Sequence, residues 1–318
     1  MRRPSRWNLL LLVLLAASGA RAETLKLAVG QKGFWDTSIA VWGERAGFFK
    51  QEGLDLDILY TDGGAQTQQA VLSGGVQIGI GVGTLGVLSA AVKGAPVRVI
   101  AAEWHGASDL FWYVKSDSPV RTMKDAAGRS AAFSAAGSSS NLVLLALLDA
   151  AGVRARPTPT GGAGATLTQV MSGQIDIGWS VPPIGLDVEA AGGLRIIGRG
   201  TDLPALSGQT TRVNIANAAW LRDNRGAAVR FARAYERSLA FAYGDPQAVR
   251  WFAEGLDIDL TLANRVRDAY YPAAAMQPGT MKGLDATLRD MLDQKRVPPG
   301  TTLEQLQPAL DLLHEAAS

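Results

Sequence analysis

The feature that most constrains the fold of this chain is an internal repeat. The segment "VLSGGVQIGIGV" (71–82) returns as "VMSGQIDIGWSV" (170–181), and six positions are identical at an offset of 99 residues. In each copy the pattern predicts an amphipathic helix that ends at Ser-Gly and is followed by a buried strand. A repeat of a whole helix–turn–strand unit predicts two similar α/β halves within one chain.

The first copy belongs to a longer alternation of strands and helices. Strands are predicted at "TLKLAVG" (24–30), "LDLDILY" (54–60), "VQIGIGV" (76–82) and "VRVIAAEW" (97–104). The second strand alternates apolar and acidic residues, as expected of an edge strand with one face in solvent. Helices are predicted over about 65–73 and 84–93, and a further helix contains Ile39, Trp42, Ala46 and Phe49 and ends at Gly53. Strands separated by helices predict a mainly parallel sheet flanked by helices.

The N-terminus predicts export from the cytoplasm. Three arginines within residues 1–6 precede the apolar run "LLLLVLLAA" (9–17), and Ala20 and Ala22 stand in an A-x-A arrangement. This is the pattern of a signal peptide over residues 1–22, because the apolar run is too short to span a bilayer. We therefore expect a periplasmic protein.

Charge and composition exclude several classes of protein. The predicted signal peptide holds four arginines and no acidic residue, so the remaining 27 basic and 29 acidic residues leave a net charge of −2. This balance gives no reason to expect a nucleic-acid partner. The absence of cysteine excludes disulfides, thiolate nucleophiles and cysteine-ligated metals. With two histidines in the whole chain, we expect neither a metal site nor a cofactor.

One glycine motif favours a different class. Gly81, Gly83 and Gly86 have the G-x-G-x-x-G spacing of a dinucleotide site, and Glu103 stands where a ribose-binding carboxylate is expected. An NAD-dependent dehydrogenase is therefore an alternative. Two observations disfavour it. The motif follows the third predicted strand and not the first, and the second repeat copy has Ser180 and Pro182 in place of Gly81 and Gly83.

Several segments together resemble a known family. The passages "LKLAVGQKG" (25–33), "ERAGFFKQEGLDLDIL" (44–59) and "VMSGQIDIGWSVPP" (170–183) are similar to the periplasmic solute-binding proteins of ABC importers for nitrate, sulfonates and taurine, a family that includes thiamine-precursor binders. Pro182 and Pro183 depart from the pattern, because many members carry an acid and an aromatic residue there. The resemblance therefore does not carry the identity of the solute over to this chain.

The resemblance implies a type II periplasmic-binding-protein fold with two lobes and two crossing strands. The crossing strands are expected within 110–117 and 211–221, so that 23–112 plus 213–318 form lobe 1 and 113–212 form lobe 2. It implies no catalysis. A monomer would capture a small anion, most simply a sulfonate, and deliver it to a transmembrane permease subunit with a cytoplasmic ATPase. An enzyme on the same bilobal fold, similar to a pyrimidine-precursor synthase, is the second alternative.

Candidate ligand-binding residues lie in the loops that follow predicted strands, because ligands of open α/β sheets bind beyond the carboxyl ends of the strands. They are Gln31, Lys32, Phe34, Trp35, Gly83, Thr84, Trp104, His105, Ser138, Ser139, Ser140 and Trp179. Backbone N–H groups and hydroxyls at Thr84 and at the three serines would hold an oxyanion. The three tryptophans would enclose an organic part of the ligand.

Each of these expectations has a structural alternative. Trp35 can pack beneath its own helix, and a lone histidine such as His105 is more often structural than functional. Thr84 is expected to cap its helix in either case, and one of the serines is expected to be an N-cap. Arg212 enters the second crossing strand and reaches either a negative ligand or the surface.

Overall fold

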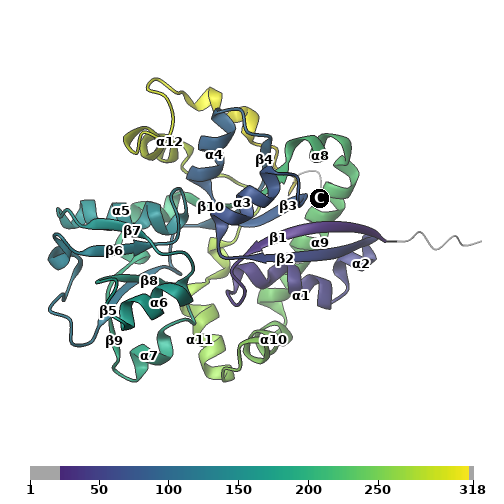
Figure 1. The fold of residues 1–318 in the computed structure, drawn as a ribbon. Helices are drawn as coiled ribbons and strands as arrows, with labels where there is room; N and C mark the ends of the chain where they lie inside the picture. Colours follow the sequence, from purple (N-terminus) through teal and green to yellow (C-terminus); the bar gives the residue numbers. More distant parts are fainter. Residues whose placement is uncertain (1–21, 315–318) are drawn as a thin grey trace, which may run out of the picture.

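The computed structural model describes residues 22–314, which form two lobes side by side (Figure 1). The predicted signal peptide, apart from Ala22, lies outside the described residues. Between residues 22 and 314 no helix combines the length and the apolar character that crossing a bilayer requires.

The first lobe is built on a five-stranded sheet with the order β2-β1-β3-β10-β4. Its strands are β1 (Glu23–Gly30), β2 (Leu54–Thr61), β3 (Ile78–Gly83), β4 (Val97–His105) and β10 (Thr210–Asn217). Strands β2 and β3 run parallel to β1, whereas β10 is antiparallel to its neighbours β3 and β4. The four predicted strands are confirmed, and β2 is the edge strand that its alternation indicated.

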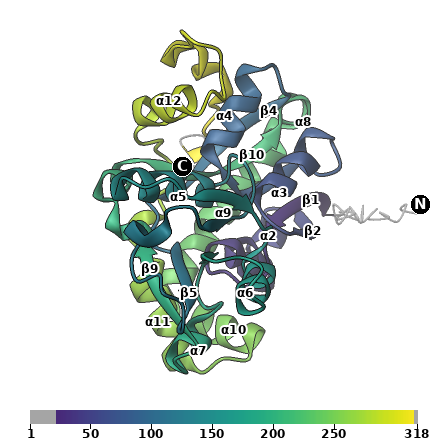
Figure 2. The ribbon, with the colours of Figure 1, turned by 60° about the vertical axis from the view of Figure 1, so that its left-hand side comes forward.

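Helices from both ends of the chain pack around this sheet. They are α1 (Ile39–Arg45), α2 (Phe48–Gln51), α3 (Gly64–Leu72), α4 (Thr84–Val92), α8 (Ala218–Asp223), α9 (Arg225–Gly244), α10 (Pro246–Leu256), α11 (Leu260–Tyr270) and α12 (Leu284–Asp293). Helices α12 and α4 lie at one end of the molecule, and α10 and α11 lie at the other (Figures 1 and 2). The predicted helices over 65–73 and 84–93 are confirmed as α3 and α4.

The helix predicted to end at Gly53 is two shorter helices. Gly47, between α1 and α2, has a φ of 80°, which places it in the left-handed region. Glycine adopts this conformation without the steric cost of a Cβ, so the chain turns here. The apolar spacing is still used, because Phe49 packs against Phe231 of α9 with ring centroids 5.4 Å apart.

The second crossing strand is shorter than predicted, because a capping residue ends it. The Asn217 side chain accepts hydrogen bonds from the backbone N–H groups of Ala219 and Trp220, at 3.1 and 3.2 Å, and so starts α8. Its amide also donates to the carbonyl of Val71, at 3.0 Å. The residues after Asn217 are therefore helical where the apolar pattern alone predicted strand.

The second lobe repeats this plan with fewer helices. Its strands are β5 (Phe111–Lys115), β6 (Ser130–Phe133), β7 (Arg156–Pro159), β8 (Gly178–Ser180) and β9 (Leu194–Arg199), and its helices are α5 (Ser139–Ala151), α6 (Ala163–Met171) and α7 (Leu186–Ala190). The three strands β8-β5-β9 and the pair β6-β7 are joined by a parallel bridge between Ala131 and Ile177. The order is then β7-β6-β8-β5-β9, which matches that of the first lobe strand for strand.

The two copies of the sequence repeat have equivalent helix bounds and an equivalent pair of hydrogen-bonded hydroxyls. Helix α6 spans the same positions as α3 at the offset of 99 residues. The Thr61 and Thr67 hydroxyls lie 2.8 Å apart, and the equivalent hydroxyls of Thr160 and Thr166 lie 2.6 Å apart. The prediction of two similar α/β halves is confirmed.

Strands β5 and β10 lie at the two points where the chain was expected to cross between the lobes. Strand β5 pairs within the second lobe and β10 within the first. The residue boundaries of the lobes, after 112 and after 212, stay a prediction.

Replacing the capping residue should destabilise the first lobe. We expect Asn217→Ala to lower the free energy of unfolding by about 1–2 kcal/mol, because two backbone N–H groups at the start of α8 lose their acceptor. Chemical denaturation measures this loss. Asn264→Ala is the matched control, because Asn264 lies in the middle of α11, caps no helix and donates to the Leu260 carbonyl within its own helix. An equal effect of the two substitutions would contradict the capping role.

Candidate functional site

A cavity lies between the two lobes and receives residues from both. Its volume is about 50 Å³. The first lobe contributes residues that follow β1 and β3, and the second contributes the loop before α5 and the end of β8. Around 10–15 Å³ of such space holds one water molecule, so the cavity admits a ligand of only a few non-hydrogen atoms in this arrangement of the lobes.

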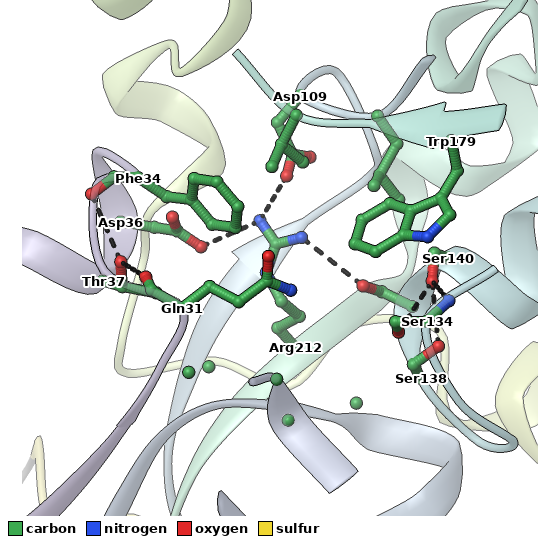
Figure 3. Close-up of a pocket in the computed structure, with 18 residues that line it drawn as sticks. Gln31, Phe34, Asp36, Thr37, Asp109, Ser134, Ser138, Ser140, Trp179 and Arg212 are labelled. Atoms are coloured by element: carbon green, nitrogen blue, oxygen red, sulfur yellow. Dashed lines mark hydrogen bonds and ion pairs between the residues drawn. The ribbon is translucent and has the colours of Figure 1, made fainter. Parts of the chain in front are cut away.

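Arg212 of β10 stands at the centre of the cavity, and only 8% of its side chain is exposed (Figure 3). Its Nη2 atom lies 3.1 Å from Oδ2 of Asp36 and 2.9 Å from Oδ2 of Asp109. Its Nη1 atom points to the Ser139 hydroxyl, 3.5 Å away. Figure 3 shows the guanidinium between Phe34 and Trp179, so that a charged group and two aromatic rings meet in one small space.

The surroundings of Arg212 determine its charge. Burial disfavours the charged guanidinium, but Asp109 and Asp36 outweigh this effect and raise the pKa of Arg212. The ring of Trp104 lies 5.2 Å from the guanidinium carbon and adds a cation–π contact. Arg212 is therefore cationic at any pH at which the protein is folded.

Glu103 lies behind Gly81, next to this cluster, and is buried. Burial first, and then the charge of Asp36, raise the pKa of Glu103 well above its ordinary value. Both of its carboxyl oxygens lack a hydrogen-bond partner among residues 22–314. An isolated buried carboxylate is unfavourable, so the surroundings of Glu103 favour its protonated form.

The N-termini of three helices line the same cavity. They belong to α3 and α4 from the first lobe, at Gly64 and Gly83, and to α5 from the second lobe, at Ser138–Ser140. Free backbone N–H groups and the helix dipole make such termini favourable for negative groups. The cavity therefore combines donors at the helix starts with the carboxylates of Asp36 and Asp109.

The serines before α5 form a hydrogen-bonded cluster. The Ser138 hydroxyl accepts from the backbone N–H of Asn141, at 3.1 Å, which confirms that one serine is an N-cap. The Ser140 hydroxyl lies 3.0 Å from that of Ser138 and accepts from the backbone N–H of Ser134 at 2.9 Å. These bonds fix the hydroxyls, so the loop enters the cavity in a defined conformation.

Direct hydrogen bonds hold the lobes against each other around the cavity. Oε1 of Gln31 accepts from the backbone N–H of Ala163, at 3.1 Å, and the carbonyl of Gly137 accepts from the N–H of Gly86, at 3.2 Å. On the same side, Arg296 donates to Oδ1 of Asn141 at 2.7 Å. The structure is therefore a closed arrangement of the two lobes.

The glycine motif serves this closure. A Cβ placed on Gly83 would lie 2.5 Å from the Gly137 carbonyl of the other lobe, and one on Gly86 would lie 3.2 Å from the same oxygen. The absent side chains let the two backbones meet, and a cavity of about 50 Å³ has no room for a dinucleotide. Gly81–Gly86 therefore does not act as a dinucleotide fingerprint here.

Part of the predicted residue set lines the cavity. These residues are Gln31, Phe34, Gly83, Ser138, Ser139, Ser140 and Trp179. Gln31 has a φ of 40°, which is uncommon for a residue with a Cβ, and the Thr37 hydroxyl donates to its carbonyl at 2.9 Å. The second repeat copy places Trp179 at the cavity, whereas the equivalent residue of the first copy, Ile80, is in the core.

Two of the predicted tryptophans do not line the cavity. Trp35 is fully buried in the first lobe, edge-on to Trp42 at 4.7 Å and to Phe252 at 5.2 Å between ring centroids. Trp104 lies behind Arg212 and supports its guanidinium. In this arrangement Trp35 and Trp104 are buried in the first lobe, and Trp179 is the one of the three tryptophans that lines the cavity.

Three further candidates also lie elsewhere. Lys32 lies over the ring of Tyr60, 5.7 Å from its centroid, and borders a separate groove. The ring of His105 lies 2.9 Å from the Thr210 hydroxyl and lines a different pocket, together with Lys282. Burial, followed by the charge of Lys282, lowers the pKa of His105 to about 4. Thr84 is buried as the first residue of α4, and Gly83 occupies the cap position instead.

The residues that sequence reasoning missed are Asp36 and Asp109. Both are almost fully buried and line the cavity. A signal for Asp109 was present, because it is a single acid directly before the apolar run "LFWYV" (110–114). The sequence left open whether Arg212 faces a ligand or the surface. It lies in the cavity, where it pairs with these two carboxylates.

Within residues 22–314 no group of three or more His, Asp or Glu residues is arranged to hold a metal ion. The polar groups that the cavity does offer are a guanidinium, two carboxylates, hydroxyls and helix N-termini. Such a set of groups is suited to hydrogen bonds and charge contacts with a small polar molecule.

The overall structure defines a protein with the periplasmic-binding-protein fold. The alkanesulfonate-binding protein SsuA from Xanthomonas axonopodis pv. citri, bound to MOPS, is similar with a TM-score of 0.76 and 19% identity, over 91% of this chain and 98% of that chain. The periplasmic nitrate-binding protein NrtA from Synechocystis PCC 6803 has a TM-score of 0.70 at 12% identity, over 92% and 88%. The desulfurization enzyme DSZB has a lower TM-score of 0.62 at 17% identity, over 89% and 96%.

The family is shown by the sequence. The sequence model described as NMT1/THI5 like matches residues 37–249, which is more than half of the 318-residue chain. The chain therefore belongs to the NMT1/THI5-like family. No curated protein matches it.

Removing the central cation should destabilise the fold. We expect Arg212→Met to lower the free energy of unfolding by roughly 3–5 kcal/mol, because Asp36 and Asp109 would stay buried without a counter-charge. Arg222→Met is the matched control, since its pair with Asp223 is exposed and exposed pairs contribute about 0–1 kcal/mol. Denaturant titration measures the free energy of unfolding of both variants. If Arg212→Met lowers it by no more than Arg222→Met does, the role of the ion pairs is refuted.

Replacing Glu103 should change how stability depends on pH. The raised pKa lets the folded protein keep a proton that the unfolded chain loses above its ordinary value of 4.5, so wild-type stability falls as the pH rises toward the folded-state pKa. Glutamine does not titrate and removes this fall. We expect the stability of Glu103→Gln relative to wild type to be greater at about pH 8 than at about pH 5 in chemical unfolding. If the stability difference between Glu103→Gln and wild type shrinks or stays constant as the pH rises, the result counts against a raised pKa of Glu103.

Proposed function

We propose that this protein is the extracytoplasmic solute-binding component of an ABC importer. In this proposal it captures a small, sulfonate-like organic anion between its lobes and delivers it to a transmembrane permease that is driven by a cytoplasmic ATPase. The observation that carries the proposal is a polar cavity lined by both lobes and closed by hydrogen bonds between them. The signal-peptide pattern of residues 1–22 supports a periplasmic location.

The proposed cycle uses the two lobes as a clamp. In an open form the start of α5 and the starts of α3 and α4 lie apart, and the anionic group of the ligand binds to their N–H groups. Closure brings Gly83 against Gly137 and excludes water, which strengthens each charge–dipole contact. The ligand favours closure only by its greater affinity for the closed form. Trp179 and Phe34 then cover its apolar part.

An enzymatic function on this fold is not favoured. The solved structures that resemble this chain are mainly binding proteins, and the likeness to DSZB is weaker than that to SsuA. The cavity holds no histidine, and His105 lies outside it. The charged side chains that line it are paired with one another, as suits binding.

The proposal predicts that a ligand stabilises the protein and that lobe contact is needed for it. The purified mature chain is screened by thermal shift against sulfonates, carboxylates, nitrate and pyrimidines, and the affinity for the best compound is measured by calorimetry. We expect Gly83→Val to weaken that affinity by about tenfold or more, because its side chain would meet the Gly137 carbonyl on closure. Its backbone, with φ −60° and ψ 124°, accepts valine without strain.

Gly226→Ala is the control, because a Cβ at Gly226 meets nothing within 4 Å. It should leave both affinity and thermal midpoint close to wild type. The proposed function fails if no small solute stabilises the protein, or if Gly83→Val binds as tightly as the control.

A further inference from the structure

We propose that this protein has a second ligand site, at the junction of the two lobes, for a small carboxylic acid with an apolar body. The site, called the hinge pocket here, lies among residues 105–108, 200–207 and 272–282 and has a volume of about 350 Å³. None of its lining residues lines the cavity between the lobes. Sites for small molecules typically measure about 300–1,000 Å³. The site goes beyond the proposed function, and only its effect on solute affinity rests on that function.

The hinge pocket is formed mainly by the two segments that join the lobes. Residues 106–108 belong to the first crossing, between β4 and β5, and the short helices η3 (Gly200–Asp202) and η4 (Pro204–Gly208) belong to the second, between β9 and β10. The remaining wall is η5 (Ala273–Ala275) with Lys282, between α11 and α12. Helix η3 packs against α5 of the second lobe, and η5 packs against β4 of the first. The width of the pocket therefore depends on how the lobes are placed.

The charge of the hinge pocket suits an acid. Of the side chains that line it, Lys282 carries a positive charge and none is acidic. Nζ of Lys282 donates to Oε1 of Gln277, at 3.0 Å, and an ammonium group has three N–H donors. A carboxylate bound here meets a cation with donors to spare and no like charge among the lining residues.

His105 adds a neutral donor to the same wall. The Thr210 hydroxyl oxygen accepts from the backbone N–H of Lys282, at 2.8 Å, so its own hydrogen is directed to Nδ1 of His105, 2.9 Å away. The ring proton is then on Nε2, which is buried and makes no hydrogen bond to residues 22–314. Because buried donors need acceptors, a carboxylate oxygen beside this ring satisfies a group that the protein leaves unpaired.

The rest of the hinge pocket is largely apolar. Its walls include Ala107, Leu203, Pro204, Pro272 and Ala275. Burial of apolar surface contributes about 25 cal/mol per Å², so a hydrocarbon or aromatic body adds to the affinity of an acid here. The pocket therefore matches an acid with several carbon atoms better than an inorganic anion.

The first crossing segment connects the hinge pocket to the cavity between the lobes. Ala107 and Ser108 line the pocket, and the next two residues, Asp109 and Leu110, line the cavity. Gly200 is held against this segment, because its N–H donates to the Leu110 carbonyl at 2.8 Å and a Cβ on it would lie 2.0 Å from the Ala107 carbonyl oxygen. A ligand that contacts both crossing segments and η5 binds this closed arrangement more tightly than one in which the lobes have moved apart. It thereby stabilises closure.

The first experiment compares acids with their uncharged amides on the purified mature chain. Hexanoate and benzoate are titrated against hexanamide and benzamide by calorimetry. We expect each acid to bind about fivefold more tightly than its amide or more, because hydrogen bonds to a charged group are stronger than those to a neutral one.

Variants assign this preference to the hinge pocket. Lys282→Met should lower the affinity for each acid to about that for its amide, while the backbone bond to Thr210 is kept. Lys124→Met is the control, because Lys124 is exposed on η2 (Met123–Ala126) and lies outside the pocket. Should Lys282→Met fail to fold, His105→Asn gives a second comparison. Asparagine offers Thr210 an acceptor but lacks the Nε2 donor, so it should also weaken the acids and not the amides.

The second experiment measures closure directly. The chain has no cysteine, so Ser73→Cys and Ser172→Cys together place two spin labels at exposed, equivalent positions, one in each lobe. We expect saturating hexanoate, and not hexanamide, to raise the population at the label distance of the closed arrangement in pulsed EPR. By linkage, hexanoate should also tighten the best compound of the solute screen by about fivefold, and that compound should tighten hexanoate by the same factor.

Three results would overturn the inference. The acids could bind no more tightly than the amides, Lys282→Met could bind them as Lys124→Met does, or hexanoate could shift the label distances toward an open form. Competition between hexanoate and the solute also counts against it, because the acid would then occupy the cavity between the lobes. The solute screen and Gly83→Val test the proposed function separately. If that screen finds no solute, the acid–amide titrations and the label distances still decide on the hinge pocket.

Discussion

The contacts of Arg212 with Asp36 and Asp109 join three segments that are far apart in the chain. Asp36 follows β1, Asp109 follows β4 at the first crossing between the lobes, and Arg212 lies in β10 at the second crossing. Burying these charges is unfavourable unless they are paired, so the segments must meet in one geometry. Next to this group, the Thr211 hydroxyl donates to the carbonyl of Gly106, at 2.6 Å, and ties the two crossing segments together. The same residues therefore support the fold and form the floor of the cavity.

The duplication explains how such a small site can be built. Each half places a helix start at the end of a strand, so two facing halves bring several helix N-termini to one cavity. Backbone N–H groups at these helix starts can donate hydrogen bonds into the cavity whatever side chains the residues carry. The copies could therefore diverge, and the first supplies glycines that allow close approach while the second supplies Trp179. Gly83 both lines the cavity and meets the Gly137 carbonyl of the second lobe, so one position serves the cavity and the closure.

The elements were predicted well where the spacing of apolar residues is regular. Strands β1 to β4 and helices α3 and α4 follow from periodicity alone, because a strand or helix with one buried face needs that spacing in any fold. The errors are local. Gly47 breaks a helix through its left-handed φ, and Asn217 ends a strand by capping α8, since one residue's backbone or side-chain hydrogen bonds outweighed the apolar pattern around it.

The sequence by itself determined that the chain is duplicated, that each half is an α/β unit, and that Gln31, Ser138–Ser140 and Trp179 stand at strand ends or helix starts. These properties depend on neighbours in the chain, which a single sequence records. Tertiary structure alone decided that Trp35 and Trp104 belong to the interior and that Asp36, Asp109 and Arg212 meet in the cavity. Tryptophan suits a core and a ligand pocket equally. The role of a charged residue depends on its partners, and only folding brings Asp36 and Asp109 to 3.1 and 2.9 Å from Arg212.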